Sequence, residues 1–401
     1  MDRWPNKYVI GLTGNIATGK SVVRQMLQHL GAYTIDADGL AHQAMSPGAP
    51  AYRPIVETFG QFILNPDKSI NRSMLATIVF SNKDALGKLE AITHPIVGQA
   101  INTLVSRAKQ PIVVIEAIKL LEGDLVKGVS AVWVVDAKPK TQYARLVGKR
   151  KMAADEAKTR MLGQNPQSEK LKAATLVIQN DGNIEDTWKQ VQVAVAKLAP
   201  APSAPPKPEP VVKKEAVAEK PVEPKKAVAA PGPAAIVGVT VRRGMPDNAE
   251  DIANFINTAT GKSIGRVDIM MAFGEKSYLV ASDESETTVG LSGWQVENLI
   301  TCVDELYVTE SPEVSNVIHA LVRAIEEASN ALQSEVSFIF LPVDVSQSIL
   351  EPFFANGYET ITMEEIKIPA WRESVQNVLE EDENRQLLTK KLRQDRVLKP
   401  M

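Results

Sequence analysis

Residues 14–21 have the types and the spacing of a phosphate-binding loop. They read Gly-Asn-Ile-Ala-Thr-Gly-Lys-Ser, which fits the pattern G-x-x-x-x-G-K-[ST]. In such a loop, backbone N–H groups curve around a phosphate, and the glycines permit the backbone angles that this path requires. Lys20 can neutralise the β- and γ-phosphates, and the Ser21 hydroxyl can bind a magnesium ion. The pattern therefore predicts a site that binds a nucleotide through its phosphates.

The segments on either side of this loop are typical of an α/β protein. Residues 8–12 form an apolar run with strand character, and a helical pattern begins at Lys20. Four apolar residues share one face of that helix: Val22, Val23, Met26 and Leu27. The N-terminus of the helix adds to the anion site, because its first N–H groups are unpaired. A chance match within a glycine-containing turn is the alternative, and the flanking strand and helix argue against it.

Two carboxylates follow the next predicted strand. Residues 32–35 have strand character and lead into Asp36-Ala37-Asp38. Because ligands collect at the carboxyl ends of strands in an open α/β sheet, we expect this pair to face the phosphate loop. The carboxylates could orient magnesium and accept a proton from an attacking hydroxyl group. A helix N-cap explains aspartate at such a junction equally well, so this segment alone leaves both accounts open.

Three further predicted strands lie at residues 112–115, 131–135 and 175–178. They are rich in Val and Ile and alternate with helical patterns, which predicts a parallel sheet covered on both faces. Residues 40–109 are mostly helical in pattern and form an insertion where a substrate-covering subdomain would lie. His94-Pro95 interrupts this pattern, and a histidine before proline is more often a packing or turn residue than a catalyst.

A long helical pattern between the last two strands carries Arg145, Arg150 and Arg160. In phosphoryl-transfer enzymes, a mobile lid with arginines neutralises the charge of the transition state and excludes water. A solvated, charged helix face is the alternative, and for any single arginine it is the more common explanation.

The composition is that of an ordinary soluble protein. The chain has 401 residues, enough for two or three domains, with 44% hydrophobic and 23% charged residues. Its net charge of -3 gives no indication of nucleic acid or an anionic membrane as a partner. The single cysteine, Cys302, excludes an intrachain disulfide. No signal-peptide or membrane-span pattern is present, so we expect a cytoplasmic protein whose oligomeric state is open.

Short pieces of residues 7–198 follow one another in a specific order and spacing. They are residues 12–21, 35–38 and 71–72 with Leu75 and Phe80, residues 89–95, Gln142 with Arg145, Arg160 with Gln164, and Ile178 with Asn180 and Gly182. Together these pieces resemble dephospho-coenzyme A kinase. The resemblance implies a P-loop fold of the nucleoside-monophosphate-kinase type, with a helical insertion and a lid.

The resemblance also implies a reaction and a set of site residues. The family transfers the γ-phosphoryl group of ATP to the ribose 3′-hydroxyl of dephospho-CoA, the last step of coenzyme A synthesis. The residues implied in catalysis are Asp38 as general base, Lys20, Arg145 and Arg160. Those implied in ATP binding are Gly14, Asn15, Ile16, Ala17, Thr18, Gly19, Lys20, Ser21, Val22, Arg150 and Asn180. Dephospho-CoA binding is implied for Thr13, Asp36, Arg72, His94 and Glu122, and Mg²⁺ binding for Ser21 and Asp36.

Three positions depart from the family pattern. Asn15 and Ala17 stand where members usually have glycine, which makes the loop stiffer. Lys119 stands where an apolar residue is expected, in the segment of residues 118–122 that forms a wall of the site after the third strand and ends at Glu122. Another small-molecule kinase of the nucleotide-kinase type is the alternative; it would share the loop, the sheet and the lid but not the series Asp36, Asp38, Arg72 and His94.

The rest of the chain predicts a linker, a second domain and a tail. Residues 199–236 are Pro, Ala, Lys, Glu and Val without periodicity, which indicates a disordered linker between domains that share few contacts and unfold independently. Residues 237–370 are predicted to form an α+β domain. Residues 371–401 are predicted to be a charged tail, helical or disordered.

In residues 237–370, strands are predicted at residues 239–242, 277–281, 299–308 and 336–341, and helices at residues 314–332 and 346–356. This order of strands and helices resembles a GNAT-type N-acyltransferase. Members of that family have a glycine-rich loop for the acyl-CoA pyrophosphate, but residues 311–316 contain no glycine, and Glu313 would repel the pyrophosphate. We therefore expect a non-catalytic binding or regulatory domain. A bifunctional kinase/acyltransferase, a CoA-sensing scaffold and a domain kept for solubility or assembly are the alternatives.

Overall fold

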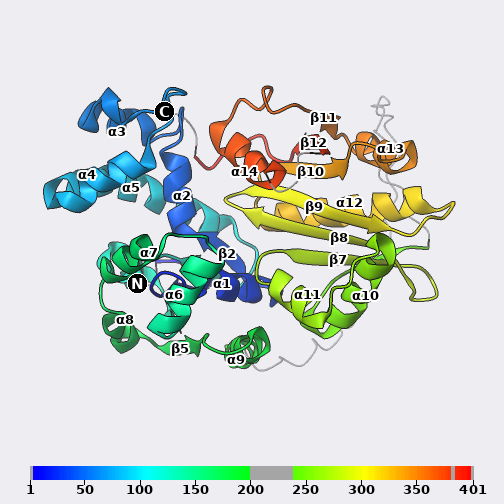
Figure 1. The fold of residues 1–401 in the computed structure, drawn as a ribbon, viewed down its shortest axis with the longest axis horizontal. Helices are drawn as coiled ribbons and strands as arrows, with labels where there is room; N and C mark the ends of the chain where they lie inside the picture. The colour runs from blue at the N-terminus through cyan, green and yellow to red at the C-terminus, as the bar shows by residue number, and fades with distance from the viewer. Residues whose placement is uncertain (1–2, 199–237, 381–383, 399–401) are drawn as a thin grey trace, which may run out of the picture.

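The computed structural model describes residues 3–198, 238–380 and 384–398. The predicted linker, residues 199–236, lies outside the described residues. Two sheets, each with its own helices, lie side by side in the molecule (Figure 1). No helix in the described ranges is both long enough and apolar enough to cross a membrane.

The first sheet confirms the parallel α/β prediction. Its strands are β1 (Tyr8–Thr13), β2 (Tyr33–Asp36), β3 (Ile112–Glu116), β4 (Ala131–Asp136) and β5 (Leu176–Gln179). They pair in the order β2-β3-β1-β4-β5, and every pair is parallel. Since β1 is central and fully flanked, its apolar residues are buried on both faces, as the sequence of a parallel strand requires.

Helices cover this sheet and build the insertion. They are α1 (Lys20–His29), α2 (Ala37–Ala44), α3 (Tyr52–Phe59), α4 (Arg72–Ser81), α5 (Lys83–Arg107), α6 (Pro139–Gly148), α7 (Ala154–Leu162), α8 (Gln167–Ala173) and α9 (Ile184–Ala196). Helices α3 and α4 project away from the sheet (Figure 1), whereas the C-terminal half of α5 buries apolar residues in the same core as β3.

The expected interruption at His94-Pro95 is wrong, because α5 continues through Pro95. Proline removes one helical hydrogen bond, which leaves the carbonyl of Ala91 without its partner. Both Ala91 and Pro95 are exposed, so water can solvate that carbonyl and the helix tolerates the residue.

The second sheet confirms the α+β prediction for the C-terminal half. Its strands are β6 (Thr240–Arg243), β7 (Ser277–Ser282), β8 (Thr288–Glu297), β9 (Ile300–Val308), β10 (Val336–Pro342), β11 (Glu359–Thr360) and β12 (Arg385–Lys391). They pair in the order β11-β12-β10-β9-β8-β7-β6, antiparallel except for β9 with β10. The helices are α10 (Ala249–Thr260), α11 (Arg266–Ala272), α12 (Val314–Ala331), α13 (Gln347–Ala355) and α14 (Pro369–Leu379).

The prediction of a charged helical or disordered tail is wrong for residues 385–391. This segment forms β12, which lies inside the sheet between β11 and β10. Charged and polar residues at both ends of the segment hide the signal of its centre, where Leu387 and Leu388 are buried. Helix α14 also begins at Pro369, just before the predicted boundary of the second domain.

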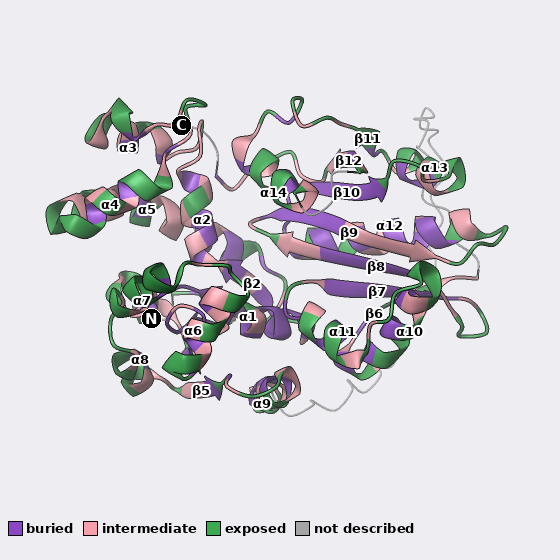
Figure 2. Cartoon of the chain, in the orientation of Figure 1, coloured by how far each residue is buried: buried purple, intermediate pink, exposed green. Residues whose placement is uncertain are grey.

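The two halves share an extensive interface, so the expectation that few contacts join them is wrong for the described residues. Residues of both halves belong to the same buried apolar clusters, and α1 and β7 are largely buried (Figure 2). Buried polar groups also pair across the interface. Gln333 Nε2 donates to the carbonyl of Leu104 at 2.9 Å, and Gln25 Nε2 donates to Ser277 Oγ at 3.3 Å.

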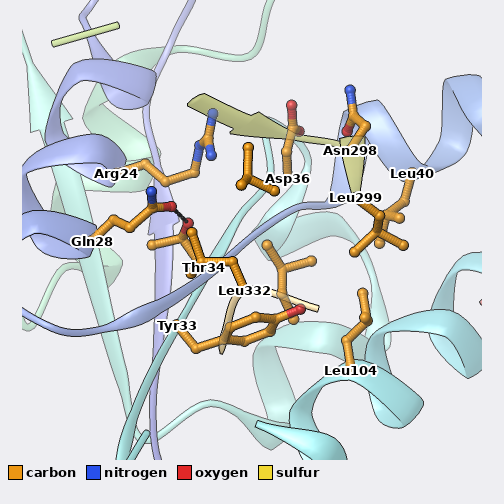
Figure 3. Close-up of a pocket in the computed structure, with 12 residues that line it drawn as sticks. Arg24, Gln28, Tyr33, Thr34, Asp36, Leu40, Leu104, Asn298, Leu299 and Leu332 are labelled. Atoms are coloured by element: carbon orange, nitrogen blue, oxygen red, sulfur yellow. Dashed lines mark hydrogen bonds between the residues drawn. The ribbon is translucent and has the colours of Figure 1, made fainter. Parts of the chain in front are cut away.

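The two-residue turn between β8 and β9 contacts the first domain. Figure 3 shows Asn298 and Leu299 of this turn facing β2 and Leu40 of α2, around a cavity of about 20 Å³ with room for roughly one water molecule. An added Cβ at Gly39 would lie 2.0 Å from Asn298 Oδ1, so the turn packs directly on the backbone of α2. Gln43 Nε2 donates to the Asn298 carbonyl at 2.6 Å.

His29 provides a test of this interface. Its ring lies edge-on to Phe273 with ring centroids 5.1 Å apart, and Nε2 is 3.0 Å from the Phe273 carbonyl, to which it donates. Burial lowers the pKa of the imidazole to about 4, and the hydrogen bond offsets only part of that effect. The unfolded chain binds this proton at about pH 6.5. The stability contributed by the neutral ring is therefore present above that pH and is lost as the pH falls toward the folded value.

We expect the melting temperature of the wild type to fall more steeply than that of His29→Gln as the pH is lowered from about 6.5 to about 4. Glutamine keeps a donor for the Phe273 carbonyl but has no titrating group. Scanning calorimetry of both proteins across this range is the measurement, and parallel slopes would contradict the expectation. A single cooperative transition at neutral pH would agree with the shared interface.

Candidate functional site

The predicted phosphate loop joins the end of β1 to the start of α1, and its glycines are required by close packing. Gly14 and Gly19 have φ of 153° and 97°. An added Cβ would lie 2.4 Å from the Val135 carbonyl oxygen at Gly14, and 2.0 Å from Asn180 Nδ2 at Gly19. Ala17 also has a positive φ, 58°, so this position, where glycine is expected, keeps the left-handed backbone at some strain.

Two side chains hold the back of the loop. Arg145 Nη1 donates to the carbonyls of Ala17 and Thr18 at 3.1 Å each, and its Nη2 donates to the Asn180 carbonyl at 2.7 Å. Asn180 Nδ2 also donates to Thr18 at 2.8 Å. Because these bonds occupy the carbonyls, they fix the loop from behind. Arg145 therefore supports the loop backbone in this structure, a contact that the lid assignment did not anticipate.

Two glutamines occupy N–H groups of the loop. Gln164 Oε1 accepts from Ile16 N at 2.7 Å, and Gln167 Oε1 accepts from Asn15 N at 3.0 Å. The buried Lys170 ammonium donates to Asn15 Oδ1 at 2.6 Å. These amide oxygens therefore occupy acceptor positions that phosphate oxygens take in a loop of this kind. Gln167 and Lys170 escaped the sequence analysis, because a glutamine and a lysine in a helical lid carry no local signal for such a contact.

Lys20 lies buried at the start of α1, with Nζ 3.5 Å from the Asn15 carbonyl oxygen. Burial lowers the pKa of its ammonium group, and the nearby carboxylates of Glu116 and Asp38 act in the opposite direction. The predicted loop lysine and the predicted base are thus close enough to influence each other electrostatically. The exposed Arg150 is a further charge that acts on the pKa of Lys20.

Glu116, the last residue of β3, is a site residue that the sequence analysis missed. Its Oε1 accepts from Ser21 Oγ at 3.1 Å, and its Oε2 accepts from Arg24 Nε at 2.8 Å in a buried ion pair. In the parallel register it stands beside both Leu12 of β1 and Asp36 of β2. An acidic residue at the end of an otherwise apolar strand was the available signal.

Asp36 and Asp38 have different environments. Asp36 Oδ1 accepts from Gly39 N at 3.0 Å and caps α2, so the N-cap account applies to this residue. Asp38, in the first turn of α2, accepts from Ile118 N at 3.1 Å. Burial raises the pKa of the Asp38 carboxyl to about 6, and the negative charge of Asp36 adds to this effect.

The other predicted residues are spread more widely. Thr13 Oγ1 donates to the Ile118 carbonyl at 3.2 Å, and Glu122 Oε1 accepts from Asn165 Nδ2 at 3.0 Å, so both lie in the wall beside the loop. His94 is exposed on α5. Arg160 pairs within α7 with Glu156 at 2.7 Å on the protein surface. Arg72 pairs with the carboxylate of Glu373, in α14 of the second domain.

The donor set near the loop fits a hard cation held chiefly by the oxygens of a bound nucleotide. Ser21, Asp36 and Glu116 provide hydroxyl and carboxylate oxygens, the type of ligand that Mg²⁺ prefers. No group of three or more His, Cys, Asp or Glu side chains within the described ranges is arranged to hold a metal by itself. Magnesium bound through one or two side chains and phosphates does not need such a group.

Comparison with known proteins assigns the family. A family model described as dephospho-CoA kinase matches residues 8–186. The dephospho-CoA kinase of Geobacter metallireducens is 45% identical over 186 residues, which cover 46% of this chain and 92% of that protein. The chain belongs to the dephospho-CoA kinase family. The corresponding kinase of Moorella thermoacetica is 40% identical over 195 residues, 48% of this chain and 92% of its own length.

Solved structures resemble each half of the chain separately. TT1252 from Thermus thermophilus is 29% identical, covers 48% of this chain and 99% of its own, and has a TM-score of 0.44. An acetyltransferase of the GNAT family from Staphylococcus aureus Mu50 is 10% identical, covers 39% of this chain and 99% of its own, and has a TM-score of 0.29.

The family assignment confirms the predicted activity. The chain is a kinase of coenzyme A biosynthesis that uses ATP to phosphorylate dephospho-CoA. The family assignment also excludes the alternative of another nucleotide-type kinase. The roles of the individual side chains stay predictions.

We expect Lys20→Ala to lower kcat by about a thousandfold, because phosphoryl transfer depends on a fixed cation at the transferring phosphate. Lys189→Ala, which removes an exposed lysine from α9, is the matched control and should retain wild-type kcat. Production of CoA and ADP is the measurement, and circular dichroism checks that the fold is intact. A folded Lys20→Ala enzyme with half of the wild-type kcat would show that the loop assignment is wrong.

Proposed function

We propose that Asp38 is the general base that accepts the proton of the ribose 3′-hydroxyl of dephospho-CoA while the γ-phosphoryl group of ATP is transferred to that oxygen. The observation that supports this role is the position of the carboxyl group. It is half-buried at the carboxyl end of the first sheet, held by Ile118 N, and close enough to Lys20 for the two groups to shift each other's pKa. A base with a raised pKa near neutrality is well matched to proton transfer.

The phosphate loop supplies the electrostatic part of this mechanism. ATP phosphate oxygens replace the amide oxygens of Gln164 and Gln167 at Ile16 N and Asn15 N, and Lys20 contacts the β- and γ-phosphates. The N-terminus of α1, where Ser21 and Val22 follow Lys20, favours the same negative charge. Arg145 and Asn180 keep the loop in the shape that this contact needs.

Magnesium completes the site in this proposal, with Ser21 as a ligand and Asp36 and Glu116 as the nearby carboxylates. The ion supplies charge neutralisation at the phosphates when it is bound. Ser21 must exchange its hydrogen bond with Glu116 for the cation, and Glu116 then accepts from Arg24 alone. Arg150 and Arg160, on the segment from α6 to α7, are the mobile cations of the lid.

On the acceptor side, Thr13, Asp36 and Glu122 line the wall next to the base, and Arg72 and His94 belong to the helical insertion. We assign Arg72 to an anionic group of dephospho-CoA, because a guanidinium binds a phosphate through two parallel hydrogen bonds. The single, buried Cys302 fits a reducing compartment, so we assign the enzyme to the cytoplasm.

We expect Asp38→Asn to lower kcat by about a hundredfold to ten-thousandfold, with much smaller changes in KM for both substrates, because the variant keeps the side-chain shape and loses the base. Asp251→Asn, which removes an exposed carboxylate from the first turn of α10, is the control and should retain wild-type kcat. Steady-state kinetics with ATP, magnesium and dephospho-CoA is the measurement. Normal turnover by Asp38→Asn would place the base elsewhere.

We also propose that residues 237–370 form a domain without acyltransferase activity, attached to the kinase of residues 1–198. The proposal is supported by the loop before α12. Its residues 311–316 have no glycine, and hydrogen bonds within the segment already occupy the N–H groups of Glu313, Val314 and Asn316. Few N–H groups are therefore left to bind a pyrophosphate.

The full chain should not transfer an acetyl group from acetyl-CoA to amine acceptors, at any rate above that of the buffer. Release of free thiol is the measurement, in the Lys20→Ala background so that kinase turnover does not interfere. Calorimetric titration with CoA and acetyl-CoA separates the remaining cases. Because the kinase site itself binds CoA, a second site without turnover agrees with a CoA-sensing domain, no second site agrees with a scaffold, and acetylation of an amine would contradict the proposal and favour a bifunctional enzyme.

A further inference from the structure

A cavity of about 500 Å³ lies where the helical insertion of the kinase meets the second domain. Its kinase side is formed by the end of α2 and the segment before α4, and includes His42, Asp67 and Arg72. Its other side is formed by α14, with Arg372 and Glu373. The cavity thus combines two guanidinium groups, one from each domain, with two carboxylates. It is large enough for part of a substrate of the size of a nucleotide.

This cavity is close to the base. Asp38 and His42 are four residues apart on α2, which places them on the same face of the helix, one turn from each other. Burial lowers the pKa of His42, and the charges of Arg72, Asp36 and Glu373 all act on it as well. A helix of the second domain therefore lies within electrostatic reach of the acceptor side of the kinase.

Arg72 and Glu373 join the two domains across the cavity. Arg72 Nη1 and Nη2 donate to Glu373 Oε1 and Oε2, both at 3.0 Å, in the parallel bidentate arrangement. The side chains are 45% and 51% exposed, so water screens the pair and its net contribution to stability is small. The two oxygens of Glu373 occupy the donors with which a guanidinium binds a phosphate.

We propose that Glu373 competes with an anionic group of the acceptor substrate for Arg72, so that the second domain sets the KM for dephospho-CoA. This inference rests on the proposed role of Arg72 in binding that substrate. Substrate binding exchanges one bidentate partner of Arg72 for another and leaves the Glu373 carboxylate to the solvent. Arg372 lines the same cavity, and its Nη2 donates to the Ile366 carbonyl at 2.7 Å. It provides a second cation for the incoming anion.

If Glu373 competes with the substrate for Arg72, its removal has an effect on acceptor binding that is not expected for a purely structural ion pair. Removing the competitor should strengthen acceptor binding, although it removes a contact between the domains. The net contribution of an exposed ion pair changes an equilibrium constant by a factor of up to about five. We therefore expect Glu373→Gln to lower the KM for dephospho-CoA about twofold to fivefold and to leave kcat and the KM for ATP unchanged.

Two controls distinguish the loss of the Arg72–Glu373 pair from a general change in surface charge. Glu364→Gln removes one exposed carboxylate from the segment before α14 and should leave the KM for dephospho-CoA unchanged. In the Arg72→Ala background, Glu373→Gln should have no further effect, because the group for which it competes is gone. Steady-state kinetics on the full chain at fixed ionic strength measures all of these variants, with thermal unfolding as the check of the fold.

The possible failures are distinguishable. If Arg72→Ala leaves the KM for dephospho-CoA unchanged, the assignment of Arg72 to the acceptor is wrong and the inference is overturned with it. If Arg72→Ala raises that KM but Glu373→Gln leaves it unchanged or raises it, the competition is overturned and the proposed role of Arg72 stands. A lower melting temperature of Glu373→Gln without a change in KM is the result of a structural ion pair, and it also overturns the competition.

Discussion

The site depends on the close packing of the phosphate loop between β4 and the segment after β5. At Gly14 and Gly19 there is no room for a side chain, because the Val135 carbonyl and the Asn180 amide lie where a Cβ would be. Arg145 and Asn180 occupy carbonyls on one side of the loop. A loop held from behind in this way can direct its N–H groups to a ligand at little cost in reorganisation, which is the main requirement of phosphoryl-transfer catalysis.

A second constraint links the base to the C-terminal domain. The turn at Asn298 and Leu299 has φ of 50° and 68°, as a two-residue hairpin turn requires, and it packs on Gly39, the residue after Asp38. Arg24 extends the link, because it pairs with Glu116 at 2.8 Å and approaches Glu297 at 3.9 Å. The second domain therefore forms part of the framework that positions α2.

Local patterns in the sequence were sufficient for the phosphate loop, the five parallel strands and the long helix α12, since each has a strong period or a fixed spacing of glycines. They were insufficient for β8, which contains Gly290 and Gly293. Glycine weakens the signal of a strand, but an added Cβ at Gly290 would lie 2.6 Å from Val317 Cγ1 of α12. That glycine is required by the close approach of the helix, which only the tertiary structure reveals.

The same limit applies to the site. The sequence placed Lys20, Ser21 and Asp38 correctly at one end of the sheet, because parallel strands bring their carboxyl ends together. It gave no indication of Gln167, Lys170 or the pair of Arg72 with Glu373, since each contact joins residues that are far apart in the chain. The interface was missed for a related reason, because a linker composition describes only the connection and says nothing about the surfaces that it joins.

The central claim is that the half-buried Asp38 carboxylate takes up the proton of the acceptor hydroxyl. The pH dependence of kcat/KM for dephospho-CoA tests it most directly, because this quantity reports the ionisation of the free enzyme. With the pKa of Asp38 raised to about 6 by burial, the account predicts that kcat/KM of the wild type falls as the pH decreases through about 6, and that this acidic limb is absent from the residual activity of Asp38→Asn. The same limb in both enzymes would contradict the account.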